Sequence, residues 1–233
     1  MAKQLEPPQP LPTSADPYAG MVDHFDLMAQ TGWGADLEAA FIDFLAPTAH
    51  WRCLEAGCGT GRFALRLAER VTGVVGTDRS EPMILRARIN AAQAGIGNAR
   101  FEVAAVESLP GPLRSTFDLV VAMRLLFFLP DPLRGLKQLA AAAAPGGWVG
   151  ICNPHAQMSP EGAASYADAN GLQGFARESL AGWARVAARH LSWDEETAVT
   201  RLQEAGLTEV TAAPALEGLG LFAKGRRPAA SAG

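Results

Sequence analysis

Residues 54–63 read Leu-Glu-Ala-Gly-Cys-Gly-Thr-Gly-Arg-Phe, and this stretch decides the fold class. The apolar run at 51–56 predicts a strand, and 63–71 carries apolar side chains at helical spacing. Glycines between a strand and a helix let the backbone approach a ligand closely, because they adopt φ angles that other residues avoid. The stretch therefore predicts a strand, a ligand-binding turn and a helix.

The spacing of the glycines indicates which ligand the turn accepts. A dinucleotide site needs G-x-G-x-x-G, but here Gly61 comes one residue early and Arg62 stands where glycine or alanine is required. This disfavours a pyrophosphate and suits a smaller nucleoside that carries an amino acid. We expect Glu55 to organise the loop or hold an ammonium group, and Arg62 to approach a carboxylate.

Asp78 follows the second predicted strand, residues 73–77. An acid at this position accepts hydrogen bonds from ribose hydroxyls. The alternative is that Asp78 only caps the helix that Ser80 begins. Together with the glycine turn, its position favours ribose binding.

Strand and helix patterns alternate along the chain. Further strands are predicted at 101–105, 117–123 and 148–152, and a helix begins at Asp131 and stops at Pro145. A capping box at 192–195 predicts a last helix ending at Gly206, and 210–213 and 219–224 form a closing pair of strands. This alternation predicts a Rossmann-like, doubly wound α/β sheet that is mostly parallel.

The 233 residues fit one domain with short extensions. We expect a flexible arm at 1–16, a domain at 17–224 and a flexible tail at 225–233. Residues 155–191 interrupt the alternation after the fifth strand, at the sheet edge where open α/β sheets bind ligands. We predict a helical lid there; the alternative is a cover for the core.

Composition narrows the function classes. Twenty basic and 24 acidic residues give a net charge of −4, which argues against a general nucleic-acid binder. The three cysteines cannot form a disulfide framework, and no apolar run reaches the roughly 20 residues that a bilayer requires. We expect a cytoplasmic protein with no stable membrane association and no metal site; the oligomeric state, monomer or homodimer, stays open.

Five motifs resemble those of class I S-adenosylmethionine-dependent methyltransferases, in particular the small-molecule group that includes the ubiquinone/menaquinone type. They are LEAGCGTGRF at 54–63, GVVGTDRSEPM at 73–83, VESLP at 106–110, FDLVVAM at 117–123 and PGGWVGI at 145–151. The resemblance implies a seven-stranded sheet with an antiparallel last strand. It also implies S-adenosylmethionine as cofactor and S-adenosylhomocysteine as product.

The same resemblance assigns roles by motif position. It places Gly57, Gly59, Gly61 and the Met123 backbone at the methionine part, Asp78 at the ribose, and Arg79, Met83, Val106 and Glu107 at the adenine. Many relatives have an acid where this chain has Ala105, so adenine recognition departs from the pattern here.

The acceptor side is predicted from residues near the expected pocket. His155 follows the fifth strand and is the candidate general base, although a lone histidine is more often structural; His24 is a weaker candidate, and His190 is expected at the surface or in packing. The predicted pocket residues are Tyr18, Trp33, Arg124, Phe128, Tyr166 and Trp183. The aromatic members have ordinary core packing as their alternative.

The sequence thus predicts methyl transfer from S-adenosylmethionine to a small, partly apolar acceptor. Two alternatives stay open. One is an aminopropyl or other group transferase on the same fold, and the other is a non-enzymatic cofactor-binding or partner-binding module.

Overall fold

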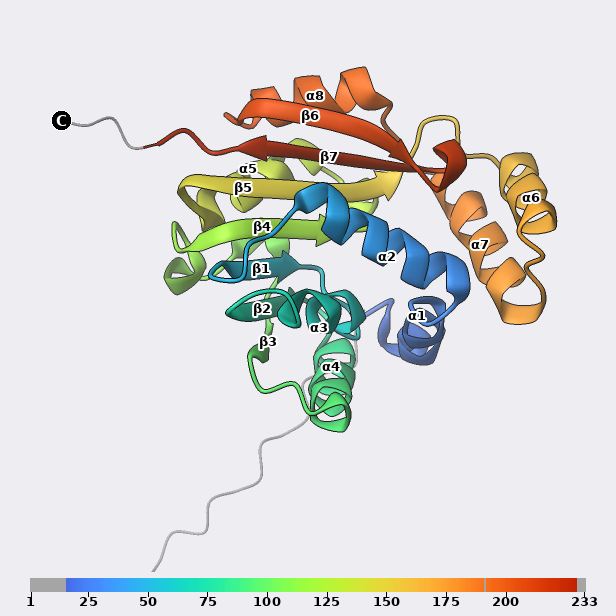
Figure 1. The fold of residues 1–233 in the computed structure, drawn as a ribbon, viewed down its shortest axis with the longest axis horizontal. Helices are drawn as coiled ribbons and strands as arrows, with labels where there is room; N and C mark the ends of the chain where they lie inside the picture. The colour runs from blue at the N-terminus through green and yellow to red at the C-terminus, as the bar shows by residue number, and fades with distance from the viewer. Residues whose placement is uncertain (1–15, 191, 230–233) are drawn as a thin grey trace, which may run out of the picture.

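The computed structural model describes residues 16–190 and 192–229, which form a sheet with helices on both faces (Figure 1). The strands are β1 Arg52–Ala56, β2 Gly73–Asp78, β3 Ala99–Val103, β4 Phe117–Met123, β5 Ala143–Pro154, β6 Thr208–Ala215 and β7 Gly220–Arg226. The α-helices are α1 Val22–Met28, α2 Gly32–Leu45, α3 Arg62–Ala68, α4 Glu81–Ala94, α5 Pro132–Ala142, α6 Pro160–Ala169, α7 Gly174–Ala187 and α8 Glu195–Glu204. Short 3₁₀ turns are η1 Ala19–Met21, η2 Val106–Ser108, η3 Gly111–Leu113, η4 Leu126–Phe128 and η5 Leu216–Gly218.

The strand order is β3-β2-β1-β4-β5-β7-β6. Strands β1 to β5 pair in parallel, whereas β7 runs antiparallel to both β5 and β6. The predicted doubly wound α/β sheet with seven strands and an antiparallel last strand is confirmed. The order in which strands are added to the sheet reverses between β1 and β4, which run parallel, and such sheets bind ligands at this point.

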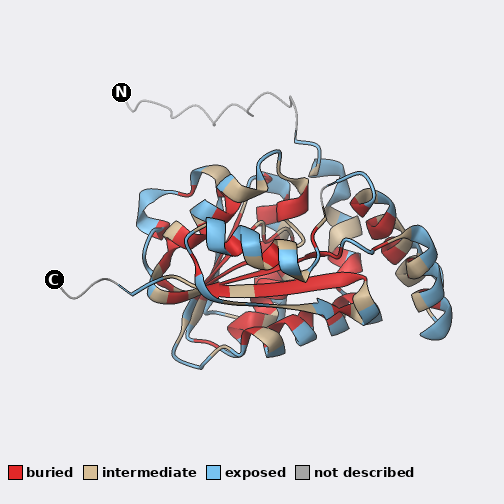
Figure 2. Ribbon diagram, turned by 90° about the horizontal axis from the view of Figure 1, so that it is seen from above, coloured by how far each residue is buried: buried red, intermediate tan, exposed pale blue. Residues whose placement is uncertain are grey.

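Each face of the sheet has its own apolar core. Side chains of α2, α3, α4 and α7 pack on one face, and side chains of α5 and α8 pack on the other. The central strand β4 is buried on both faces from Leu119 to Met123, in keeping with the apolar sequence of this part, and Figure 2 shows the buried residues concentrated along the strands. The carboxyl ends of the parallel strands are thereby held rigidly under the loops that follow them.

Several helix starts follow from local chemistry. The Ser80 and Asp131 side chains accept hydrogen bonds from the Met83 and Arg134 amides, so both predicted N-caps are confirmed. The last helix differs: its N-cap is Asp194, which accepts from the Thr197 amide, and not Ser192. The predicted capping box was therefore placed two residues too early.

Other boundaries also differ from the prediction. Strand β3 begins at Ala99, two residues early, because the turn after α4 ends at Asn98, whose carbonyl accepts from the Val74 amide. Strand β5 begins at Ala143, because α5 ends there and the chain joins the sheet before the Pro-Gly-Gly sequence. The predicted tail at 225–233 is wrong at its start, because Gly225 pairs with β5 and Arg226 pairs with both β5 and β6.

The predicted arm at 1–16 lies outside the described residues except for Asp16. The Ser80 hydroxyl donates to Asp16 Oδ2 at 2.6 Å, so the chain is tied to the start of α4 at this point. No described helix combines the length and apolar character needed to cross a bilayer.

Candidate cofactor and acceptor site

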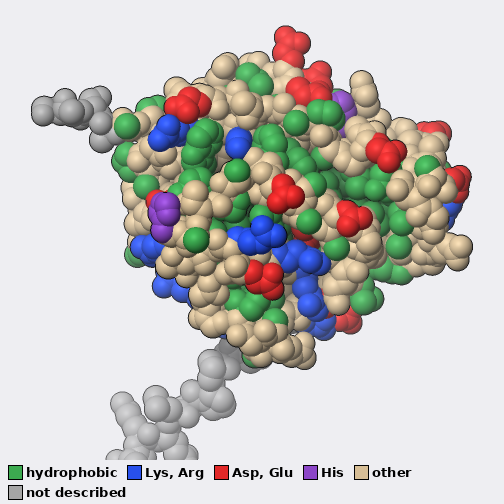
Figure 3. Space-filling model, in the orientation of Figure 1, with side chains coloured by type: hydrophobic (Ala, Val, Ile, Leu, Met, Phe, Trp, Pro, Cys, Tyr) green, Lys and Arg blue, Asp and Glu red, His purple; other side chains and the backbone are tan. Residues whose placement is uncertain are grey.

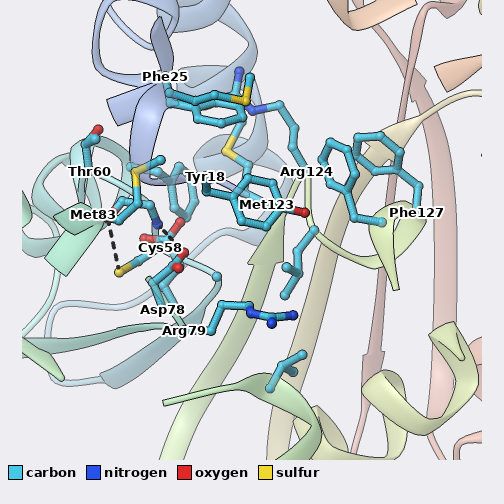
Figure 4. A pocket seen from close by; sticks show the side chains of 18 of the residues that line it. Tyr18, Phe25, Cys58, Thr60, Asp78, Arg79, Met83, Met123, Arg124 and Phe127 are labelled. Carbon is cyan, nitrogen blue, oxygen red and sulfur yellow. Dashed lines mark hydrogen bonds between the residues drawn. The ribbon is translucent and has the colours of Figure 1, made fainter. Parts of the chain in front are cut away.

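A cavity of about 520 Å³ opens at the carboxyl ends of β1, β2 and β4. Its volume lies within the range of small-molecule sites. Figure 4 shows Asp78, Arg79, Met83 and Thr60 on one side, Arg124 and Phe127 on the other, and Tyr18 and Met123 between them. We call the first side the nucleoside half and the second the acceptor half.

The glycine turn after β1 forms the floor of the nucleoside half. Gly57, Gly59 and Gly61 all have positive φ angles, between 51° and 77°. A Cβ at Gly61 would lie 2.8 Å from the Phe101 ring, so this glycine permits close packing of α3 against the sheet. A Cβ at Gly59 would meet no atom within 4 Å, which leaves its backbone open to a ligand.

Asp78 holds this turn in place. Its Oδ2 accepts from the Gly59 amide at 2.9 Å, and its Oδ1 accepts from the Ser80 amide at 2.9 Å. Burial raises the pKa of the Asp78 carboxyl, and these two backbone hydrogen bonds oppose the shift. Each oxygen keeps a further lone pair, so the carboxylate can accept from a ligand hydroxyl as well as from the protein.

The remaining predicted cofactor residues also line the cavity. They are Glu55, Gly57, Gly59, Arg62, Arg79, Met83, Val106, Glu107 and Met123. Gly61, by contrast, is not among the lining residues, because its Cα faces Phe101 and Ala87 of the core. Ala104 and Ala105 complete the wall beside Val106, with the Ala104 amide bonded to the Asp78 carbonyl at 2.9 Å.

Arg62 has a different role from the predicted one, which was to approach a carboxylate of the ligand. Its Nε and Nη2 donate to the two carboxylate oxygens of Asp26 at 2.9 Å each, so it is paired with α1 in the protein itself. Asn90 Nδ2 donates to Asp26 Oδ1 at 2.7 Å. Burial raises the pKa of Asp26, but the hydrogen bonds from Arg62 and Asn90 outweigh it, and the net pKa is below the ordinary value. The carboxylate that Arg62 meets is therefore Asp26.

The acceptor half is aromatic. Its walls come from η1 and α1, from η4, and from α7. The Tyr18 ring lies 6.4 Å from Phe25 and 6.3 Å from Phe128, centroid to centroid, and Phe128 lies 5.4 Å from His190. Burial raises the pKa of the Tyr18 hydroxyl, and the Arg79 charge opposes this. These rings, which meet one another at angles between 55° and 74°, give the acceptor half an aromatic lining.

Two buried carboxyl groups, Glu38 and Glu55, lie at this end of the cavity, and only Glu38 has ion-pair partners. Glu38 on α2 is fully buried, and it accepts from Arg66 Nε at 2.9 Å and from Arg124 Nη2 at 3.2 Å. Burial raises the pKa of Glu38, while both arginines oppose the shift. Burial also raises the pKa of Glu55 well above its ordinary value, and its Oε2 has no hydrogen-bond partner among the described residues.

Three residues predicted for the acceptor side lie outside the cavity. His155 is 4% exposed, its Nδ1 accepts from the Gln157 amide at 3.0 Å, and its Nε2 donates to Glu195 Oε2 at 3.0 Å. It also bridges to Trp193, which draws it toward α8 and away from the β1–β4 crevice. The predicted base at His155 is therefore corrected: its imidazole is used in packing the start of α8.

Trp33 and Tyr166 are likewise corrected. Trp33 is 1% exposed and stacks on Trp183 at 5.6 Å with an interplanar angle of 12°. Its Nε1 donates to the Ala176 carbonyl at 3.0 Å, so it fastens α7 to α2 from behind the cavity wall. Tyr166 lies on α6, which packs on the outer side of α7. Of the six predicted pocket residues, Tyr18, Arg124, Phe128 and Trp183 line the cavity.

Sequence reasoning missed part of the acceptor wall. Met21, Phe25, Met28 and Glu38 line the cavity from the N-terminal segment, and His190 lines it beyond α7 although it was expected in packing or at the surface. His24, the weaker candidate base of the sequence analysis, also lines the cavity. The amphipathic spacing of Met21, Phe25 and Met28 was the available signal. Within the described residues, no cluster of three or more His, Cys, Asp or Glu is arranged to hold a metal ion.

Comparisons with known proteins agree with this geometry. Residues 53–147 match a family model described as a methyltransferase domain. A ubiquinone biosynthesis O-methyltransferase from Paracidovorax citrulli is 34% identical over 113 residues, which cover 48% of this chain and 48% of the relative. One from Chromobacterium violaceum is 30% identical over 139 residues, which cover 55% and 60%. The chain spans about half the length of the curated relatives it matches.

Solved structures share the fold over a longer stretch. A SAM-dependent methyltransferase from Aquifex aeolicus superimposes with a TM-score of 0.66 at 15% identity and covers 89% of this chain and 97% of its own. The phosphoethanolamine N-methyltransferase 2 of Haemonchus contortus, solved with S-adenosyl-L-methionine, gives 0.64 at 14% identity and covers 90% and 57%. At these identities the likeness concerns the fold.

Proposed function

We propose that this chain is a class I S-adenosylmethionine-dependent methyltransferase that transfers a methyl group to a small, partly apolar acceptor, because residues 53–147 match a family model described as a methyltransferase domain. The observation that carries the proposal is the division of one cavity. An open glycine turn tied to Asp78 lies at one side, and an aromatic wall lies at the other. The cofactor and the acceptor thus each have a surface suited to their chemistry.

The residues present fit the cofactor. Gly57, Gly59 and the Met123 backbone lie where the methionine part would pass, and Glu55 lies beside them. Asp78 would accept from the ribose hydroxyls. Arg79, Met83, Val106 and Glu107 would enclose the adenine, with the Ala105 backbone where many relatives have an acid. Gly61 supports the turn from the core side and has no direct contact in this proposal.

The reaction needs alignment and the removal of a proton. When bound, S-adenosylmethionine supplies an electrophilic methyl group. The aromatic wall would hold the acceptor in line with it and exclude water, which provides much of the rate enhancement in such displacements. We propose a hydroxyl oxygen as the acceptor atom, supported by the names of the relatives, and this hydroxyl must lose its proton. His24 and His190 are the imidazoles that line the cavity and can take it.

The lid at 155–191 stays a proposal in a narrower form. Helix α7 contributes Gly182, Trp183 and Val186 to the cavity, whereas α6 packs behind it. We propose that α7 selects the acceptor and that α6 supports α7.

We also propose a small molecule, and not a nucleic acid, as the acceptor, in the cytoplasm. The net charge of −4 supports this. On the face shown in Figure 3, Lys and Arg side chains adjoin one another near the centre, with Asp and Glu side chains around them.

Two measurements test the proposed function. Calorimetry should show binding of S-adenosylhomocysteine and no binding of NAD at the same concentration, because Arg62 occupies the position of the third dinucleotide glycine. Incubation with labelled S-adenosylmethionine and a panel of catechols and alkylphenols should yield S-adenosylhomocysteine and a labelled ether. Methylthioadenosine as the product would indicate an aminopropyl transferase instead, and tighter binding of NAD would contradict the cofactor assignment.

A further inference from the structure

Arg124 follows β4 directly and has a backbone conformation that is rare for a residue with a side chain. Its φ angle is 56°, in the left-handed region, and its amide donates to the Cys152 carbonyl at 2.6 Å. Residues held in this region cluster at ligand sites, because the surrounding structure must compensate the strain. The conformation alone identifies no ligand, but it marks Arg124 as a candidate ligand-binding residue.

The Arg124 guanidinium is largely buried and only partly paired. The side chain is 13% exposed, and Nη2 donates to Glu38 Oε1 at 3.2 Å. Nη1 is buried with no hydrogen-bond partner among the described residues. The Arg124 Cζ also lies 6.0 Å from the centre of the Trp33 ring. The Nη1 group of Arg124 is therefore available to bind a ligand.

The charges around Glu38 leave one positive charge uncompensated. Arg66 and Arg124 both pair with Glu38, so two cations share a single carboxylate. Glu55 forms no ion pair with Arg124, and burial favours the neutral form of its carboxyl. Arg66 reaches solvent with 40% of its side chain exposed, whereas Arg124 is 13% exposed and its Nη1 has no partner among the described residues, so Arg124 is the cation suited to a further anion.

The position of Arg124 in the sheet indicates which anion. Asp78 ends β2, the glycine turn follows β1, and Arg124 follows β4, and these three strands are neighbours. Strands lie about 4.8 Å apart, so β2 and β4 are separated by about 10 Å. A nucleoside anchored at Asp78 that crosses the glycine turn extends toward β4 with its amino-acid end. Arg62, the other arginine beside the turn, is already bound to Asp26 through two hydrogen bonds.

We propose that Arg124 binds the carboxylate at the amino-acid end of the cofactor, the part first expected of Arg62. This inference rests on the proposed function, because it takes S-adenosylmethionine as the ligand. It reassigns Arg124 from the acceptor to the cofactor. Glu38 acts as a positioning residue that holds the fork toward the cavity.

The test compares two ligands that differ by one carboxylate. S-adenosylhomocysteine has it, and 5′-deoxy-5′-(3-aminopropylthio)adenosine lacks it. Calorimetry on the full chain should show that Arg124→Met lowers the affinity for S-adenosylhomocysteine by about 10- to 100-fold. This is the usual effect of losing hydrogen bonds to a charged group. The same variant should bind the decarboxylated ligand within about twofold of the wild type. Arg124→Lys, which keeps the charge but loses the planar fork, should give a smaller loss toward S-adenosylhomocysteine.

Arg79→Met is the matched control, because Arg79 lines the other end of the cavity. This variant should change the affinities for both ligands by the same factor. Equal losses for both ligands in Arg124→Met, at a melting temperature close to that of the wild type, would overturn the assignment. An unchanged affinity with a raised acceptor KM would also overturn it and return Arg124 to the acceptor. If the wild type binds neither ligand, the proposed function itself fails, and this outcome is distinct from the other two.

Discussion

The two halves of the cavity are built in different ways. The nucleoside half consists of backbone and short loops that directly follow β1, β2 and β3, and Asp78 and Gly59 are joined by a single hydrogen bond. The acceptor half is assembled from η1 and α1, η4 and α7, which are distant in sequence and meet through ring contacts such as Tyr18–Phe128. The first half is therefore determined by strand geometry and the second by helix packing. This difference predicts that changes in the two halves separate into cofactor effects and acceptor effects.

The largest effect is expected where the two halves are joined. Asp26 connects α1 to Arg62 at the start of α3 and to Asn90 on α4, and it is 5% exposed. Asp26→Ala leaves a largely buried guanidinium partner without its carboxylate and should lower the free energy of unfolding by about 3 kcal/mol. Urea denaturation measures it.

Asp23→Ala is the control on the same helix. Asp23 pairs with Arg86, but its side chain is 82% exposed, so the change should stay within about 0.5 kcal/mol. A similar small loss for Asp26→Ala would mean that the two halves are not joined through this pair.

The next effect concerns the nucleoside half. Asp78→Ala should weaken the binding of S-adenosylhomocysteine by about 1.5–3 kcal/mol, because hydrogen bonds to a carboxylate are lost and the Gly59 amide loses its acceptor. Calorimetry gives the affinity, and acceptor KM measured at saturating cofactor should stay close to that of the wild type. An unchanged affinity would show that Asp78 serves only the turn and the start of α4.

A smaller effect is expected in the acceptor half. Phe128→Ala removes a half-buried ring that lies against Tyr18 and His190, and it should raise the acceptor KM by about tenfold, the equivalent of about 1.4 kcal/mol. The affinity for S-adenosylhomocysteine should change less than twofold. Steady-state kinetics and calorimetry on the same preparation measure both.

Phe44→Ala provides the comparison, because Phe44 is also half-buried but packs on Phe222 away from the cavity. It should lower the melting temperature and leave KM unchanged. If Phe128→Ala weakens the binding of the cofactor as much as that of the acceptor, the division of the cavity into two halves is wrong.

The smallest effect is expected outside both halves. His155 donates to Glu195, and this hydrogen bond holds the pKa of Glu195 below its ordinary value. A depressed pKa stabilises the fold above the ordinary carboxyl pKa, and this contribution is lost as the pH falls through the folded pKa. Glu195→Gln should lower the melting temperature by about 1 °C or less at pH 7, because the carboxylate is exposed, and the difference should vanish in acid.

Turnover of Glu195→Gln should equal that of the wild type. A clear loss of turnover would place the His155–Glu195 pair in the reaction after all. The melting curves and one activity assay at pH 7 decide the matter.

The sequence by itself determined the sheet and the nucleoside half. Strand β1 and the Gly57–Gly61 turn are adjacent in the chain, and Asp78 ends the next strand, so their parallel pairing brings them together without further information. N-caps such as Ser80 and Asp131 are equally local, because a side chain bonds an amide three residues away. Signals of this kind are readable from neighbouring residues.

Only the tertiary structure decided the acceptor half. His155 follows a strand at the correct edge of the sheet, yet its imidazole bonds Glu195 at the start of α8. Arg62 adjoins the glycine turn, yet Asp26, 36 residues away, occupies its guanidinium. His190 and Phe25 reach the cavity because helices packed by their apolar faces carry polar or aromatic side chains to places that spacing does not encode. Long-range ion pairs and helix docking depend on the free energy of the whole core, and so the sequence pattern near each residue does not determine them.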